Sequence, residues 1–261
     1  MLILGIDSAT PAASAALADE KGLLGETLLN VGLTHSEQLL PMIDDLIRQC
    51  RRTIRDVTAI GISAGPGSFT GLRIGMATAK ALAQGLSPAS LALRGSGVAL
   101  VAVPTLEAMA WQLAGQPVLV SAMLNARRGQ IYAGLYRWTP PEGDSLPPPP
   151  VQRGKKERLP AGADRGWRLE RLIPPEAVSP SVWAGRLRGR GRGVYMLGDG
   201  AAMYEDIWRR ELEGEAVILP PVLGLCRGGF VALAAIKTLE ENGAPGTEDF
   251  YRMKPVYLRG I

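Results

Sequence analysis

A glycine-rich segment, Gly65-Pro66-Gly67-Ser68-Phe69-Thr70-Gly71, stands between an apolar run and an amphipathic stretch. Glycines let a backbone approach a ligand closely, and a helix beginning here would offer unpaired amides to a phosphate-type anion. The segment lacks the Lys-Ser/Thr of a Walker loop and the spacing of a dinucleotide fingerprint. Two interpretations therefore stay open. One is an anion-binding loop; the other is a tight strand-to-helix turn in which Ser68 or Thr70 caps the helix.

Two acidic residues follow short apolar runs, where strands would end. Asp7 closes the run 2–7 and precedes Ser8. A carboxylate there can hold a metal–phosphate unit, but it can equally cap a hairpin turn. Asp199 lies in Gly198-Asp199-Gly200, which could touch a nucleoside. A plain turn is the favoured interpretation of that second segment.

Histidine and cysteine are too scarce for several kinds of site. The chain has one histidine, His35, and the residue four positions later is Leu39, so neither HExxH nor an HxxxH ligand pair exists. His35 is interpreted as a polar residue at a helix start. Cys50 and Cys226 form no CxxC pair and no disulfide framework. This usage fits a reducing compartment, and we expect the cytoplasm.

The first half of the chain predicts one lobe of ribonuclease-H type. Three short apolar runs predict a meander of strands, and crossover helices with further strands follow, which is not the strict alternation of a Rossmann fold. The expected elements are strands at 2–7, 12–18, 23–29, 57–64 and 98–103, helices at about 35–50, 69–86 and 105–114, and a strand at 117–124.

A second lobe is predicted from a faint internal echo, because 118–136 repeats the strand, turn and strand order of the N-terminus. The domains are placed at 1–116 and 117–261. The second lobe is expected to be degenerate, with an extended insert at about 139–193. Half of the 20 prolines lie in 139–180, and proline disfavours helices and central strands. The expected elements after the insert are a strand and turn at 194–201, a strand at 216–219 and helices at about 201–213 and 222–241.

The net charge of +4 is unevenly distributed. Residues 151–193 carry 11 Lys or Arg and 4 acids, so the rest of the chain is mildly acidic. The segment alone could touch RNA or a partner, or it could be a solvated loop. Bulk basicity is therefore poor support for a nucleic-acid-binding fold.

The N-terminus, MLILGIDSAT, lacks a basic region, so we expect no signal peptide. No apolar run approaches the ~18 residues of a membrane span, and we expect no membrane partner.

Several strings together resemble one family. ILGIDSAT, THSEQLLPMI, AGPGSFTGLRIGMATAKALA, LNARRGQIYAGLY, LGDG and PVYLR occur in an order and at distances similar to those of the TsaB (YeaZ) family. The resemblance is strong over about 1–138 and weak over 194–259. It implies a two-lobed α/β fold of the actin/sugar-kinase/heat-shock-protein superfamily, without the metal site of the related catalytic subunit TsaD.

The resemblance also implies a role. Such a protein is a structural, non-catalytic subunit of the complex that transfers a threonylcarbamoyl group to N6 of adenosine 37 in tRNA. It acts as a platform for a TsaD-like catalytic subunit and a TsaE-like ATPase, meets tRNA through the complex, and pairs with itself when alone. No metal and no cofactor of its own are expected, with ATP at the complex interface left open.

Two sets of site residues follow. The row of small residues that begins with Gly71 and Gly75 could serve internal packing, but the resemblance favours an interface. The expected partner interface comprises His35, Leu39, Ile43, Phe69, Thr70, Gly71, Leu72, Arg73, Gly75, Met76 and Ala79. The candidate nucleotide-binding residues are Asp7, Ser8, Gly65, Gly67, Ser68, Gly198, Asp199 and Gly200.

Other functions remain as rivals. An ATP-dependent kinase or ATPase of the same superfamily could use Asp7 and the glycine loops. However, many relatives carry a second acid where this chain has Asn125, so a two-carboxylate magnesium site is incomplete. A metallopeptidase is opposed by the single histidine. A stand-alone RNA-binding protein is supported only by the basic pI.

Overall fold

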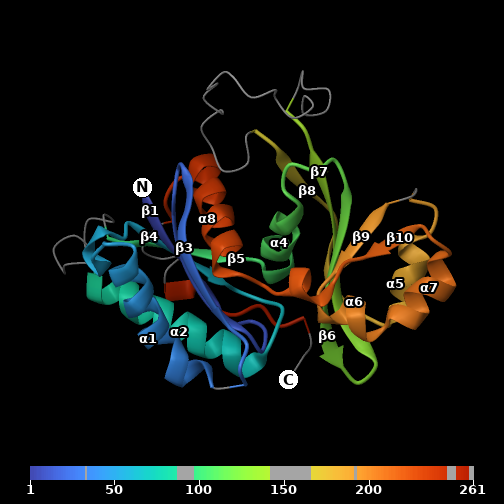
Figure 1. Cartoon of the computed structure of the whole chain (residues 1–261), viewed down its shortest axis with the longest axis horizontal. Helices are drawn as coiled ribbons and strands as arrows, with labels where there is room; N and C mark the ends of the chain where they lie inside the picture. The colour runs from blue at the N-terminus through green and yellow to red at the C-terminus, as the bar shows by residue number, and fades with distance from the viewer. Residues whose placement is uncertain (33, 87–96, 142–165, 191–192, 246–250, 259–261) are drawn as a thin grey trace.

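The computed structural model describes residues 1–32, 34–86, 97–141, 166–190, 193–245 and 251–258. Two five-stranded sheets stand side by side, with helices between them and on their outer faces (Figure 1). The predicted α/β fold of two ribonuclease-H-like lobes is confirmed.

The first sheet has the order β3-β2-β1-β4-β5. β1 pairs antiparallel with β2 and β2 with β3, whereas β4 runs parallel to both β1 and β5. β1 is buried along its whole length, which explains its continuous apolar sequence. The strands are β1 Leu2–Asp7, β2 Ala13–Asp19, β3 Gly22–Leu29, β4 Ala59–Ser63 and β5 Ala99–Val103.

The second sheet repeats this arrangement, with the order β10-β9-β6-β7-β8. β6, β7 and β8 form the antiparallel meander. β9 runs parallel to β6, and β10 runs parallel to β9. The expectation of a degenerate second lobe is therefore wrong for its sheet, which has all five strands. They are β6 Leu119–Arg127, β7 Gln130–Thr139, β8 Arg168–Val178, β9 Val194–Leu197 and β10 Ala216–Ile218.

The expected extended insert at 139–193 also needs correction. Residues 168–178 form β8, and residues 180–187 form helix α5. β8 is an outermost strand, and Pro174 and Pro175 fall where its register with β7 shifts between Ala133 and Leu135, so neither proline occupies a paired position. Residues 142–165, with the four consecutive prolines, lie outside the described residues.

The helices form three layers around the two sheets. α1 and α2 cover the outer face of the first sheet, and α5, α6 and α7 cover that of the second (Figure 1). α4 and α8 lie between the sheets. The helices are α1 His35–Gln49, α2 Phe69–Leu86, α4 Thr105–Ala110, α5 Pro180–Leu187, α6 Asp199–Met203, α7 Glu205–Leu212 and α8 Gly228–Asn242. Short 3-10 turns occur at Ile54–Asp56, Trp111–Leu113 and Pro221–Gly224.

Three expected helices differ in detail. The helix expected at 105–114 ends as the 3-10 turn Trp111–Leu113, and the one expected at 201–213 is broken at Tyr204 into α6 and α7. The last helix begins at Gly228 rather than near 222, since the segment before it is a 3-10 turn with proline at its start.

Each central helix packs on the sheet of the other half of the chain. α8, from the C-terminal half, packs on β1, β2 and β4, whereas α4 packs on β6 and β7. The approach of α8 is close: a Cβ at Gly5 of β1 would stand 2.1 Å from the Gly228 carbonyl oxygen. Trp111 and Trp138 meet edge to face between the sheets, and Trp138 Nε1 donates to the Ala110 carbonyl oxygen at 2.9 Å.

The C-terminal tail also returns to the first half. The Val256 amide donates to the Ala64 carbonyl oxygen at 2.7 Å, and Lys80 Nζ of α2 donates to the Met253 carbonyl oxygen at 2.8 Å. The chain passes between the sheets near residue 117, but residues 228–242 and 251–258 belong spatially to the first lobe. Within the described residues, no helix is long and apolar enough to cross a bilayer.

Candidate functional site: a cavity between the two lobes

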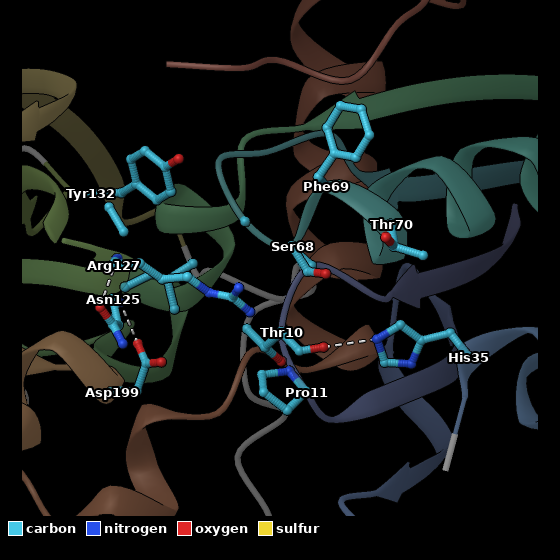
Figure 2. Close-up of a pocket in the computed structure, with 14 residues that line it drawn as sticks. Thr10, Pro11, His35, Ser68, Phe69, Thr70, Asn125, Arg127, Tyr132 and Asp199 are labelled. Carbon is cyan, nitrogen blue, oxygen red and sulfur yellow. Dashed lines mark hydrogen bonds between the residues drawn. The ribbon is translucent and has the colours of Figure 1, made fainter. Parts of the chain in front are cut away.

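A cavity of about 490 Å³ opens where the two lobes face each other (Figure 2). Its first-lobe wall consists of residues 9–11, 35 and 67–70, and its second-lobe wall of residues 124–127, 132 and 199. The predicted glycine-rich loop, the turn after β1, the turn after β6 and the start of α6 therefore meet at one place. This volume is typical of a small-molecule site.

Ser68 fixes the glycine-rich loop at the start of α2. Its amide donates to the Ala9 carbonyl oxygen at 2.7 Å, and its Oγ accepts from the Gly71 amide at 3.2 Å. Ser68 therefore caps the helix, as one of the two interpretations predicted. The cap leaves the first amides of the helix without an intrahelical acceptor at the edge of the cavity.

The glycines of this segment allow close packing on the turn after β1. A Cβ at Gly67 would stand 2.4 Å from the Ala9 carbonyl oxygen, and one at Gly71 2.0 Å from the Ser8 carbonyl oxygen. At Gly75 the nearest atom is Ser8 Oγ, at 2.1 Å. The close approach that these glycines permit is thus to the chain itself, which supports the tight-turn interpretation.

Asp7 and Ser8, which directly precede the cavity-lining residue Ala9, are fully buried. Burial raises the pKa of the Asp7 carboxyl above its ordinary value, against the opposing effect of hydrogen bonds from Ser63, Cys226 and the Ala9 amide. Burial also raises the pKa of the Cys226 thiol well above its usual range. The Ser8 hydroxyl donates to the Gly71 carbonyl oxygen at 2.9 Å. Neither Asp7 nor Ser8 lines the cavity, so the two lie apart from the other candidate nucleotide-binding residues.

His35 joins the start of α1 to the same turn. Its Nε2 lies 2.9 Å from the Thr10 carbonyl oxygen, which can only accept, so Nε2 donates (Figure 2). Its Nδ1 is buried and has no hydrogen-bond partner among the described residues. Leu39, one helical turn further, is buried in the core. The described parts of the chain contain no group of three or more His, Cys, Asp or Glu side chains placed to hold a metal ion.

The second-lobe wall is held by two side-chain oxygens that accept hydrogen bonds from backbone amides. Asp199 Oδ1 accepts from the Asn125 amide at 2.8 Å, and Asn125 Oδ1 accepts from the Arg127 amide at 2.8 Å. Burial raises the pKa of Asp199, and hydrogen bonds from the amides of Asn125 and Gly200 oppose that shift. Arg127 and Arg128 both have positive φ, 60° and 51°, which makes the turn into β7 tight. Asn125 thus orders this turn.

The structure separates the other candidate glycines from the cavity wall. Gly198 has φ +105°, and a Cβ there would stand 1.8 Å from the Met123 carbonyl oxygen, so its role is a turn. Gly65 has φ +114° and faces the Val256 carbonyl oxygen. Of the eight candidate nucleotide-binding residues, Gly67, Ser68 and Asp199 line the cavity. The sequence analysis missed Arg127 and Tyr132. Their position after β6, equivalent to the turn after β1, is the signal that could have found them.

The comparisons with known proteins agree with the resemblance of the motifs. The family described as "TsaD: tRNA N6-adenosine threonylcarbamoyltransferase" matches residues 30–207. The tRNA threonylcarbamoyladenosine biosynthesis protein TsaB of Escherichia coli is 30% identical over 61% of this chain and 68% of its own length. This chain belongs to the TsaB (YeaZ) family. TsaB of Bacillus subtilis is 28% identical over 99% of this chain and 94% of its own length. The structure of YeaZ from Pseudomonas aeruginosa shares the fold, with a TM-score of 0.68, 22% identity and coverage of 98% and 99% of the two chains.

Most of the residues expected at the interface of a TsaB protein lie inside this chain's own core. Leu39 and Ile43 of α1 and Leu72, Met76 and Ala79 of α2 pack on the first sheet. Gly71 and Gly75 are buried against Ser8. These seven are therefore corrected to core residues, because the apolar side of each amphipathic helix faces the sheet. His35 is half-buried, and the exposed residues of the set are Phe69, Thr70 and Arg73.

The exposed residues form a small cluster with the C-terminal tail. The Arg73 guanidinium lies 3.8 Å from the centre of the Phe69 ring, and its Nε donates to the Tyr257 hydroxyl at 3.2 Å. The rings of Phe69 and Tyr257 are 5.1 Å apart. The tail thereby holds Phe69 at the rim of the cavity.

Proposed function

We propose that this chain is a structural, non-catalytic subunit of the cytoplasmic complex that transfers a threonylcarbamoyl group to N6 of adenosine 37 in tRNA. In this role it is the platform for a TsaD-like catalytic subunit and a TsaE-like ATPase. It meets tRNA through that complex and pairs with itself when alone. It has no metal and no cofactor of its own, and any ATP lies at the complex interface.

Membership of the TsaB family supports the pathway, since the named relatives are tRNA threonylcarbamoyladenosine biosynthesis proteins. One observation supports the non-catalytic role. The single histidine, His35, donates through Nε2 to the Thr10 carbonyl oxygen, and Leu39 stands where a second histidine ligand would be needed. A metal-dependent transferase would have to come from another subunit.

The partner surface is assigned to the exposed side of α1 and α2. Leu40 on α1 is 52% exposed, and Phe69 at the start of α2 is 40% exposed. Large apolar side chains on neighbouring exposed helix faces are typical of interfaces. The first helical turns of α1 and α2 also border the cavity, so a partner seated there would lie next to it.

Reconstitution tests the proposal directly. tRNA lacking the modification is incubated with TsaD-like and TsaE-like subunits, a threonylcarbamoyl donor and ATP, with or without this chain. Mass spectrometry of the digested nucleosides then measures the product. We expect product only when this chain is present. Equal product without it contradicts the proposal, and phosphoryl transfer to a small molecule by this chain alone favours a kinase or ATPase instead.

A matched pair of variants tests the surface. Leu40→Lys places a charge on the exposed side of α1, and Val182→Lys does the same on α5 of the other lobe, where the exposed fraction is also 52%. We expect Leu40→Lys alone to weaken co-purification with the TsaD-like subunit and to lower product yield. Equal effects of the two substitutions would contradict the assigned surface.

A further inference from the structure

One long run of the chain has no acidic residue. Residues 57–106 contain neither Asp nor Glu, although the whole chain has 25 acids. The run forms β4, α2 and β5, and its cations among the described residues are Arg73 and Lys80, which both lie on α2. Because the chain outside 151–193 is mildly acidic, the overall charge hides this locally positive helix.

The C-terminal tail, residues 251–258, is free of acids as well. It contributes two exposed cations, Arg252 and Lys254. The nearest acids in the sequence, Glu248 and Asp249, lie outside the described residues. The tail and α2 together therefore carry four cations and no acidic side chain.

The tail lies alongside α2 and runs in the opposite direction. Lys80 Nζ donates to the carbonyl oxygens of Met253, at 2.8 Å, and Tyr251, at 3.5 Å. About two helical turns earlier, Arg73 Nε donates to the Tyr257 hydroxyl at 3.2 Å. None of these acceptors carries a negative charge, so the contacts position the two cations without neutralising them. We call the surface formed by α2 and the tail the α2–tail strip.

The tail is fixed to the fold and presents two aromatic rings. The Val256 amide donates to the Ala64 carbonyl oxygen at 2.7 Å, and Met253 packs against the core of the first lobe. Tyr251 is 66% exposed and Tyr257 is 36% exposed. The strip is thus ordered before any ligand binds, with rings and cations side by side along the tail.

Cations beside exposed rings fit a nucleic acid better than an acidic protein segment. Lys and Arg neutralise phosphates, and unpaired bases stack on aromatic side chains. The carboxylates of an acidic peptide would meet the cations, but they have no favourable contact with the negative face of a tyrosine ring. We infer that the α2–tail strip binds unpaired RNA, with phosphates beside the four cations and bases on Tyr251 and Tyr257. The inference rests on the proposed function for the identity of that RNA as tRNA, and it adds a direct contact from this chain.

Helix α1, which packs beside α2, limits the strip on its other side. The exposed charged residues of α1 are Glu37, Asp44, Asp45 and Arg48, so its outer face is negative overall. Such a face repels a phosphate backbone. The RNA is therefore expected to follow the tail, apart from the protein-partner surface around Leu40.

Fluorescence anisotropy with labelled, unmodified tRNA and the purified full chain tests the inference. The basic segment 151–193 can bind RNA too, so the differences between variants are decisive. We expect Lys254→Gln to weaken binding about three- to tenfold and to lower the slope of log affinity against log salt by about one. Tyr251→Ala should weaken binding about five- to hundredfold and leave that slope unchanged, because stacking is not ionic.

Lys21→Gln is the matched control, since it removes the same charge from an exposed turn between β2 and β3. We expect its affinity to stay within about twofold, and a circular dichroism melt should show that every variant is folded. No saturable binding at roughly 50 mM salt, equal effects of Lys254→Gln and Lys21→Gln, or full affinity in Tyr251→Ala would overturn the inference.

A protein partner on the same strip gives a different result. Weaker co-purification of Lys254→Gln with the TsaD-like subunit, at unchanged RNA affinity, would overturn the inference and assign the strip to that subunit. These outcomes leave the proposed function standing, because the product yield of the reconstitution tests it separately.

Discussion

Gly71→Ala should destabilise the protein, although alanine is the better helix former. The added Cβ would stand 2.0 Å from the Ser8 carbonyl oxygen, so the turn after β1 must shift by roughly 1 Å to restore normal contact. Overpacking of this kind costs about 1–3 kcal/mol. The hydrogen bond from the Ser8 hydroxyl to the Gly71 carbonyl oxygen would stretch, at a further cost of ~1 kcal/mol.

Helix propensity acts in the opposite direction, since alanine is favoured over glycine by ~1 kcal/mol. The net change in the free energy of unfolding is then a loss of about 1–3 kcal/mol. For a chain of this size it corresponds to a fall in Tm of roughly 2–10 °C. Differential scanning calorimetry measures it directly.

Gly85→Ala, near the end of the same helix, is the internal control. Among the described residues, no atom other than those of its chain neighbours and its own helix backbone lies within 4 Å of the added Cβ, so only the propensity gain remains. We expect its Tm to be unchanged or raised. If Gly71→Ala changed Tm in the same direction as Gly85→Ala, the close packing of α2 on the turn after β1 would not constrain residue 71. That result would refute the reasoning.

Two further predictions concern buried acids. Because burial raises the pKa of Asp7 in the folded protein, the native state holds a proton that the unfolded chain releases, and stability falls as pH rises from about 4 toward the folded-state pKa. We expect Asp7→Asn to flatten this pH dependence, so that urea unfolding shows a smaller loss of stability between pH 5 and pH 8 than in the unsubstituted protein. An unaltered pH slope would contradict the prediction. The Glu26 side chain is 7% exposed and accepts hydrogen bonds from the Arg227 guanidinium and, at 2.9 Å, from the Gly229 amide. We expect Glu26→Ala to lower the free energy of unfolding by roughly 2–3 kcal/mol. This is less than the loss for a fully buried ion pair, because water can hydrate Arg227. The exposed pair of Glu241 with Lys237 is its control, and Glu241→Ala should change urea stability by under ~1 kcal/mol.

The fold was largely predictable because its signals are local. Buried strands such as β1 carry continuous apolar sequence, and α1 carries an apolar residue at every helical turn. β8 was missed for a physical reason. Pro174 and Pro175 exclude a central strand, but the sequence does not tell which strand will be outermost.

The site was only partly predictable because it depends on distant parts of the chain. Asp7 ends a strand, as expected. The side chains that contact it when it is buried, Ser63 and Cys226, lie 56 and 219 residues further along the sequence. An apolar helix face, such as that of Leu39 and Ile43, does not tell whether it will meet its own sheet or a partner. The direction of Arg127 depends on a left-handed backbone that its residue type does not favour.

Each of α4 and α8 packs on the sheet of the other half of the chain, and this has a consequence for the nascent chain during translation. The first sheet is complete in sequence at Val103, but the helix that covers its inner face ends at Asn242. At translation rates of ~5–20 residues per second, the ribosome needs roughly 7–30 s to deliver α8. During that interval the inner face of β1, β2 and β4 lacks its native cover, so a fragment ending near residue 116 is a natural candidate for chaperone capture rather than an independent folding unit.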